Sequence, residues 1–112
     1  MSKPATRTYS RYSREAAKLL GLTIRRSRIE RGLTIDELAE RAGISRGLVQ
    51  RIERGEMGCA IGAVFEAAAI VGVPLFEAEQ KTLSTHLKTT ERMLTLLPQA
   101  VRTPGKAVKD DF

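Results

Sequence analysis

The clearest structural signal in the chain lies in residues 33–56, which read LTIDELAERAGISRGLVQRIERGE. Thr34, followed three residues later by Glu37, forms a capping box, in which each side chain satisfies a backbone amide at the start of a helix. This pattern predicts a helix over residues 35–42. Ser45 is a good helix N-cap and predicts a second helix, from about residue 46 to residue 54. We therefore expect two short helices joined by a tight turn.

The apolar residues of these two segments favour one particular arrangement. Leu38 and Ala39 are expected to point inward from the first helix, and Val49 and Ile52 from the second. Gly43, in the turn, supplies a backbone angle that a side chain would resist. The major groove of DNA is about 12 Å wide and admits one helix, while a second helix anchors it against the phosphates. This spacing is typical of a helix-turn-helix.

The same string resembles the helix-turn-helix of phage-repressor-like (Xre-type) regulators, whose usual pattern ends in a run like that of residues 52–55, IERG. The resemblance covers about residues 13–76 and implies an all-α, five-helix domain that binds double-stranded DNA. Ile35 stands where the family often has a glutamine that holds a phosphate. This departure leaves Thr34 and the amide ends of the helix for that role.

The resemblance also implies roles for individual residues. The positions that reach base edges are Arg46, Gln50 and Arg51. The positions expected at the DNA backbone are Thr34, Ser45, Arg41 and Arg54. The alternative for the first set is that the side chains are solvated or touch phosphate only. The alternative for Arg41 and Arg54 is surface ion pairing with Glu37 or Glu40, and Glu53 is expected to pair with Arg41 or Arg28.

The rest of the chain divides into recognisable segments. We expect a basic flexible arm over residues 1–12, the helix-turn-helix domain over 13–76, a C-terminal helix over 77–97 and a flexible tail over 98–112. Within the domain, Ser13 is expected to open a first helix whose stripe follows Ala16, Leu19, Leu20 and Ile24 and ends in the group of residues 27–29 (Ser27, Arg28 and Ile29). Three arginines of this helix, Arg25, Arg26 and Arg28, are expected on a solvated face. Residues 61–71 are apolar almost all round and predict a central core helix.

The C-terminal helix has an apolar stripe that the small domain does not need for its own core. Its members are Leu83, Leu87, Leu94 and Leu97, with Thr90 completing the spacing. An amphipathic helix requires a surface on which to bury such a stripe. We therefore predict that this segment forms a homodimer, with packing inside one chain as the alternative.

Positive charge is concentrated in the first half of the chain. The formal net charge is +6, and residues 1–58 hold 11 Arg and 2 Lys against 7 acids, so residues 59–112 are neutral as a whole. Arginine presents a planar fork of donors that matches phosphates and guanine edges. The distribution indicates a polyanionic partner for the N-terminal half.

Composition argues against several other classes of protein. One Cys and one His cannot form a structural zinc site, and we expect no metal, no cofactor and no catalytic residues. The longest apolar stretch, residues 59–65, is far shorter than the ~20 residues that span a bilayer. A single cysteine fits a reducing cytosol. The resemblance to phage-repressor-like regulators further implies a bacterial cytoplasmic protein associated with the nucleoid.

A narrower resemblance concerns three further segments, SRYSREAAKLLG (10–21), GAVFEAAAIVGVPLF (62–76) and the end LLPQAVR…KDDF. They look like HipB-type antitoxins, which implies a dimeric repressor that binds its own palindromic operator and neutralises a HipA-like serine/threonine kinase toxin. Two other functions stay in view. One is a protein-interaction module or a stand-alone regulator without a toxin, and the other, an enzyme, has little support in the sequence.

Overall fold

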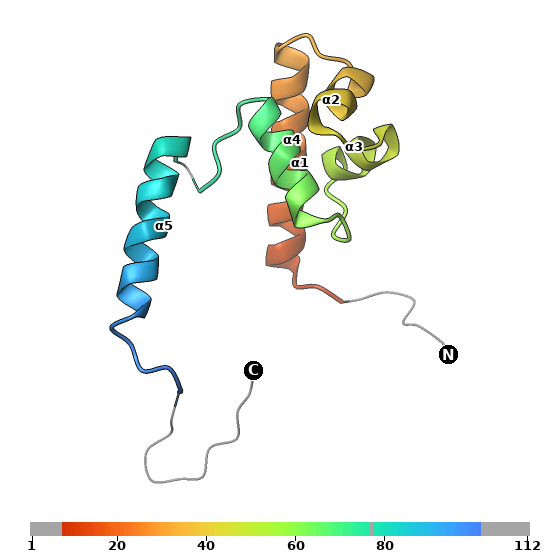
Figure 1. The fold of residues 1–112 in the computed structure, drawn as a ribbon. Coiled ribbons are helices and arrows are strands. Elements are labelled where there is room, and N and C mark those ends of the chain that lie inside the picture. The colour runs from red at the N-terminus through yellow and green to blue at the C-terminus, as the bar shows by residue number, and fades with distance from the viewer. Residues whose placement is uncertain (1–7, 77, 102–112) are drawn as a thin grey trace. The chain divides into compact units, whose positions relative to one another are not determined.

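The computed structural model describes residues 8–76 and 78–101, and this part of the chain is all-helical, as the sequence predicts. The helices are α1 (Arg11–Glu30), α2 (Ile35–Ala42), α3 (Arg46–Glu53), α4 (Ile61–Ile70) and α5 (Gln80–Leu94), shown in Figure 1. The chain divides into two compact units, Met1–Glu77 and Ala78–Phe112, so α1 to α4 form one unit and α5 belongs to the other. The predicted arm before residue 8 and the tail after residue 101 lie outside the described residues.

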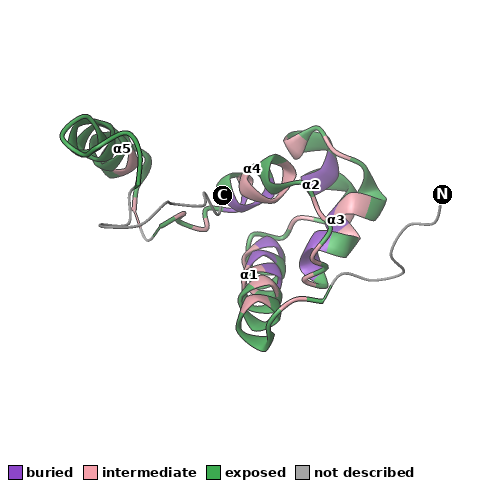
Figure 2. Cartoon of the chain, turned by 90° about the horizontal axis from the view of Figure 1, so that it is seen from below, coloured by how far each residue is buried: buried purple, intermediate pink, exposed green. Residues whose placement is uncertain are grey.

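The core of the first unit is small and lies where α1, α2, α3 and α4 meet. α2 packs against both α3 and α4, and α1 packs against α3. Figure 2 shows the buried positions on the facing sides of these helices. The buried apolar residues are Ile24, Leu38, Ala39, Val49, Ile52, Ala67, Ala68 and Val71. The four predicted inward residues of α2 and α3 are all among them, which confirms the core of the helix-turn-helix.

α1 differs from its prediction at its start and on its faces. It begins at Arg11 because Ser10, not Ser13, is the N-cap, and the Ser10 hydroxyl accepts a hydrogen bond from the Ser13 backbone amide. The buried residues of α1 are Gly21, Ile24 and Arg28. The predicted stripe is therefore wrong at Ala16, Leu19 and Ile29, which are exposed, and right at Ile24.

Two glycines allow α1 and the end of α3 to approach through their backbones. A methyl group on Gly21 would clash with the carbonyl oxygen of Ile52. A methyl group on Gly55 would lie 2.6 Å from the Cα atom of Lys18, and Gly55 also has a φ of +77°. Gly21 thus lets α1 lie close to α3, although a glycine normally weakens a helix.

The last two helices are less buried than the sequence suggests. In α4 Ala67 and Ala68 are buried in the core, so the prediction of a core helix is confirmed for that face, whereas Ile61 at its start is exposed and the helix is not central to the core. In a domain of this size α4 covers one side of the core, and its apolar composition extends beyond the packed face. α5 has no buried residue and ends at Leu94, before the predicted position 97.

Candidate nucleic-acid interface

The turn between α2 and α3 is built by the residues that the sequence singles out. Gly43 caps α2 in the left-handed conformation, with φ of 70° and ψ of 31°. Ser45 caps α3 in an extended conformation, and its hydroxyl accepts a hydrogen bond from the Leu48 amide at 3.1 Å. Because local hydrogen bonds hold both ends of this short turn, they help to fix the angle between α2 and α3.

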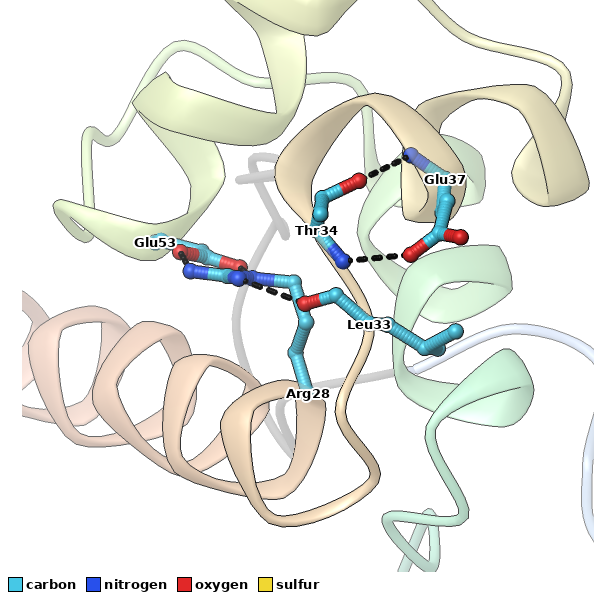
Figure 3. A network of polar contacts seen from close by, with 5 residues as sticks. All are labelled: Arg28, Leu33, Thr34, Glu37 and Glu53. Atoms are coloured by element: carbon cyan, nitrogen blue, oxygen red, sulfur yellow. Dashed lines mark hydrogen bonds and ion pairs between the residues drawn. The ribbon is translucent and has the colours of Figure 1, made fainter.

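The capping box at the start of α2 is also present. The Glu37 amide donates to the Thr34 hydroxyl at 3.0 Å, and the Thr34 amide donates to a Glu37 carboxylate oxygen at 2.8 Å (Figure 3). The hydrogen bond from the Thr34 backbone, followed by that with its side chain, lowers the pKa of the Glu37 carboxyl below its ordinary value. Glu37 is thus held as an anion that stabilises the helix start.

A buried ion pair fixes α3 against α1. The Arg28 Nε and one Glu53 carboxylate oxygen lie 2.6 Å apart, and Arg28 Nη2 donates to the other oxygen at 3.0 Å. Arg28 Nη1 donates to the Leu33 carbonyl at 2.9 Å, which ties in the segment just before α2 (Figure 3). The expected structural role of Glu53 is confirmed with Arg28 as its partner, whereas the expectation that Arg28 is solvated is wrong.

The three residues predicted to reach bases lie at different angles around α3. Arg51 is exposed and shares the outermost face with Gly47, since the two are four residues apart. Arg46 is exposed at the first turn, and its Nε lies 3.6 Å from an Asp36 carboxylate oxygen. Gln50 is half-buried and lies on the flank of α3.

Gln50 borders a shallow hollow of about 380 Å³ between α1 and α3. The rim of this hollow carries three cationic side chains, those of Lys18, Arg25 and Arg54. The sequence pattern does not mark Lys18 or Arg25 as part of the interface. The one signal that could have marked them is the pair of glycines, Gly21 and Gly55. These let α1 approach α3 so closely that one flank of α1 is continuous with the surface of α3.

The residues predicted at the DNA backbone are all exposed: Thr34, Arg41, Ser45 and Arg54. The hydroxyls of Thr34 and Ser45 are engaged as helix caps. The Arg54 guanidinium pairs with Glu56 at 2.8 Å, instead of with Glu37 or Glu40. An exposed ion pair of this kind is worth only ~0–1 kcal/mol, so Arg54 can exchange Glu56 for a phosphate at little cost.

The predicted dimerisation residues of the second unit present an apolar surface. Leu83 is half-buried, whereas Leu87 and Leu94 are exposed on α5. Leu97 is also exposed but lies beyond the end of the helix, since Thr95 is its C-cap. The helical part of the predicted stripe is therefore Leu83, Leu87, Thr90 and Leu94.

The described part of the chain contains neither a metal-binding cluster nor a membrane-spanning helix. In residues 8–76 and 78–101, no group of three or more His, Cys, Asp or Glu side chains is placed to hold a metal ion. Within the same residues, no helix is both long and apolar enough to cross a membrane.

Two comparisons with known proteins bear on this geometry. The search of curated protein sequences gives no significant match. A family model described as a helix-turn-helix domain matches residues 19–81, which is more than half of the chain and includes α2, the turn and α3. The chain therefore belongs to the helix-turn-helix domain family and carries its DNA-binding fold.

Proposed function

We propose that the protein is a sequence-specific transcriptional repressor that binds a palindromic operator as a homodimer. The observation that carries this proposal is the outer face of α3. A methyl group on Gly47 would have no neighbouring atom within 4 Å, so the backbone of α3 is open to close approach there. Arg46 and Arg51 are exposed on the same short helix, which is capped at its start and fixed from behind.

Arginine side chains at these positions suit guanine, because the guanidinium fork matches the O6 and N7 acceptors of that base. Arg51 is the residue best placed for this contact, since it shares the outermost face with Gly47. Arg46 needs only to leave its long, exposed contact with Asp36. Gln50 matches adenine N6 and N7 in chemistry, and its place on the flank favours a contact at the edge of the groove.

Phosphate contacts on the two sides of this helix fix its position in the groove. Thr34 and Ser45 each mark a helix N-terminus, where free backbone amides favour an anion. Arg41 and Arg54 supply charge at the edges of the motif. Lys18 and Arg25 extend this positive charge along the hollow beside Gln50. The phosphates of one DNA strand can therefore run along the side of the domain where α1 meets α3.

Dimerisation through the leucine stripe of α5 completes the proposal. An exposed row of leucines at helical spacing is favourable only when it is covered, and a second α5 offers the same row in return. A two-fold axis relating two α3 helices predicts half-sites one turn of DNA apart, about 10 base pairs. The bound dimer would repress by excluding RNA polymerase.

We extend the proposal to an autoregulating antitoxin of a type II toxin-antitoxin system in the bacterial cytoplasm, bound at the nucleoid. This extension rests on the resemblance of residues 10–21 and 62–76 to HipB-type antitoxins. The partner would be a HipA-like kinase. If no toxin exists, the protein is a stand-alone regulator or a protein-interaction module, and deletion of residues 99–112 distinguishes the cases: it should weaken toxin binding and leave DNA binding unchanged.

The proposed function can be tested by fluorescence anisotropy with the DNA upstream of the protein's own gene. The comparison is a scrambled duplex of the same composition and a variant with Arg46, Gln50 and Arg51 replaced by alanine. We expect at least a tenfold preference for the upstream DNA, which the variant loses. Equal, salt-sensitive binding to both duplexes would indicate a merely basic surface and contradict autoregulation.

A further inference from the structure

The outer face of α1 carries apolar side chains that the first unit leaves uncovered. Tyr12 is 84% exposed, Leu19 67%, Ile29 54% and Leu22 44%. Single exposed apolar residues are common on protein surfaces and need no explanation. Here four of them lie on one helix, and at 3.6 residues per turn their positions face away from Gly21, Ile24 and Arg28, the residues that α1 buries. Figure 2 shows that α1 has an exposed side opposite its buried one.

These residues follow the alternating three- and four-residue spacing of a helix-pairing seam. With the two charged residues that complete the spacing, the seam consists of Tyr12, Glu15, Leu19, Leu22, Arg26 and Ile29. Such a spacing keeps one row of side chains facing a partner helix along its length. We call this row the α1 seam.

The α1 seam is complementary to itself when it is reversed. In an antiparallel pair of α1 helices whose two-fold axis passes between Leu20 and Gly21, Leu19 lies opposite Leu22 of the second copy. Tyr12 then lies opposite Ile29, and Glu15 lies opposite Arg26. Every apolar residue therefore meets an apolar residue, and every charge meets its opposite.

We propose that the α1 seam is a contact surface for a second copy of this chain, which binds it through its own α1 in the antiparallel direction. A symmetric contact of this type uses the same patch on both copies, so each of the three pairings occurs twice. The contact is separate from the leucine stripe of α5, and it requires neither that stripe nor DNA.

The surface around the α1 seam is hollowed on both sides of Leu22. A hollow of about 780 Å³ borders Leu19, Leu22 and Met57. A smaller one of about 230 Å³ borders Leu22, Arg26 and Ile29. Apolar side chains of a partner helix can enter these hollows, as the side chains of paired helices do.

Two features oppose the contact, and the unfavourable free energy of each is small. Glu15 already pairs with Arg11 at 3.2 Å within the same helix, but both side chains are highly exposed, and such pairs stabilise only weakly. Lys18 and Arg25 flank the seam, and in the antiparallel pair Lys18 of one copy would lie near Arg25 of the other, which has the same charge. Both also border the hollow beside α3, which gives these long side chains room to turn aside. A seam of four apolar residues makes a weak contact that forms at micromolar or higher concentrations.

Charge reversal in the full chain tests the direction and register of the pair. Glu15→Arg alone places two arginine side chains opposite each other, and Arg26→Glu alone places two glutamates opposite each other. All proteins compared carry Leu87→Glu and Leu94→Glu, so that the α5 contact does not contribute to self-association. In this background each single variant should weaken self-association about tenfold in sedimentation equilibrium, because two pairs change at once. The double variant restores opposite charges and should return to within about twofold of the protein with the α5 substitutions alone. Glu66→Arg, at an exposed position of α4, is the matched control and should have no effect.

Cysteine trapping gives a second measurement, and because the disulfide accumulates it captures a dimer that is only weakly populated. In a Cys59→Ser background, the double variant Tyr12→Cys with Ile29→Cys should form a disulfide-linked dimer under mild oxidation. Either cysteine alone should not, because the two copies of one position lie about 25 Å apart at ~1.5 Å per residue. Circular dichroism confirms that each variant folds.

The outcomes separate the proposal from its alternatives. Rescue in the double charge variant together with disulfide formation in the double cysteine variant supports the antiparallel pair. No effect of either charge reversal, or no disulfide in the double cysteine variant, overturns it. If substitution of the α5 leucines alone abolishes self-association and the α1 variants do not affect it, α5 is the only contact between copies and the proposal fails.

Discussion

Among the individual residues, the pair Arg28–Glu53 fixes the position of α3 relative to α1 and to the start of α2. It joins α1 to α3, and the third bond of Arg28 reaches the Leu33 carbonyl just before α2. Buried charges are costly unless they are paired and hydrogen-bonded, and here both oxygens of the carboxylate have a guanidinium donor. The pair thus holds α1, α3 and the segment before α2 in one arrangement.

Breaking this pair on one side should strongly destabilise the domain. Glu53→Ala leaves the Arg28 guanidinium buried without its partner, and we expect a loss of about 3–5 kcal/mol in the free energy of unfolding. Replacing both residues, as Arg28→Met with Glu53→Leu, removes both charges and should recover most of that loss. Urea unfolding measures both effects, and a double variant no more stable than Glu53→Ala would contradict the explanation.

Arg51 should contribute more to DNA specificity than Gln50. Arg51 lies on the outermost face of α3, whereas Gln50 is half-buried on its flank. Arg51→Ala should reduce the preference for operator over scrambled DNA by about 5- to 100-fold, the value of one good base contact. Gln50→Ala should cost less than about fivefold.

Anisotropy titrations with both duplexes measure this preference. Lys88→Ala, which removes one exposed positive charge from α5, controls for net charge and should lower both affinities without changing their ratio. A larger loss of preference in Gln50→Ala than in Arg51→Ala would show that the flank of α3, rather than its outer face, reads the bases.

Residue roles are easier to predict in the helix-turn-helix than in α1. Thr34, Gly43 and Ser45 act on neighbours within a few positions, so local sequence is enough to assign them. Arg28 acts on Glu53, which is 25 residues away, and the sequence leaves Arg28 and Arg41 as equal candidates because no local pattern distinguishes a buried arginine from a solvated one. For the same reason local sequence does not reveal the flank formed by Lys18 and Arg25.

Among the helices, alanine variants of two glycines with different surroundings distinguish the effect of close packing from the effect of helix propensity. A methyl group on Gly21 would clash with the Ile52 carbonyl, whereas one on Gly47 would meet nothing within 4 Å. Gly21→Ala should therefore destabilise the domain by about 1–3 kcal/mol, in spite of the better helix propensity of alanine. Gly47→Ala should stabilise it by up to ~1 kcal/mol. The thermal unfolding midpoints of the two variants should move in opposite directions, and a stabilised Gly21→Ala would refute the close approach of α1 and α3.

The start of α2 should respond to acid in a defined direction. The pKa of Glu37 is lowered in the folded protein by its bonds with Thr34, so its contribution is complete above the unfolded pKa, about 4.3. That contribution is lost as the pH falls through the lower folded pKa. Glu37→Gln should therefore show a shallower loss of thermal stability between about pH 5 and pH 3 than the wild type does, and parallel curves would contradict this role.

Helix boundaries can be predicted from the sequence where caps and stops are strong. α2 begins and ends where its capping box and Gly43 place it. The start of α1 is ambiguous in the sequence, because Ser10 and Ser13 are both acceptable caps and only the structure distinguishes them. The burial of α4 is overestimated from sequence, because an apolar composition does not show how much neighbouring structure is available to cover a helix.

In the molecule as a whole, the proposed DNA surface and the proposed dimer contact of the leucine stripe belong to different units. The positively charged unit Met1–Glu77 holds the proposed DNA surface, and α5 in the second unit holds the leucine stripe. Replacing Leu87 and Leu94 with glutamate should make the α5 contact unfavourable while leaving α2 and α3 intact. We expect this variant, in gel-shift titrations, to keep its preference for a half-site and to lose its preference for two half-sites in fixed register, since the two-fold relation sets that register. An unchanged preference for the paired half-sites would exclude α5 as the contact that sets the register.

Selection of binding sites from a random pool of duplex DNA by the full chain would test the repressor proposal without any assumption about the operator. We expect an enriched palindrome with half-sites about 10 base pairs apart. We also expect Arg51→Ala to lose the preference at one position in each half-site while the remaining positions are retained. If no sequence is enriched although the protein binds the pool in a salt-sensitive way, then α3 does not read bases and the repressor proposal is wrong.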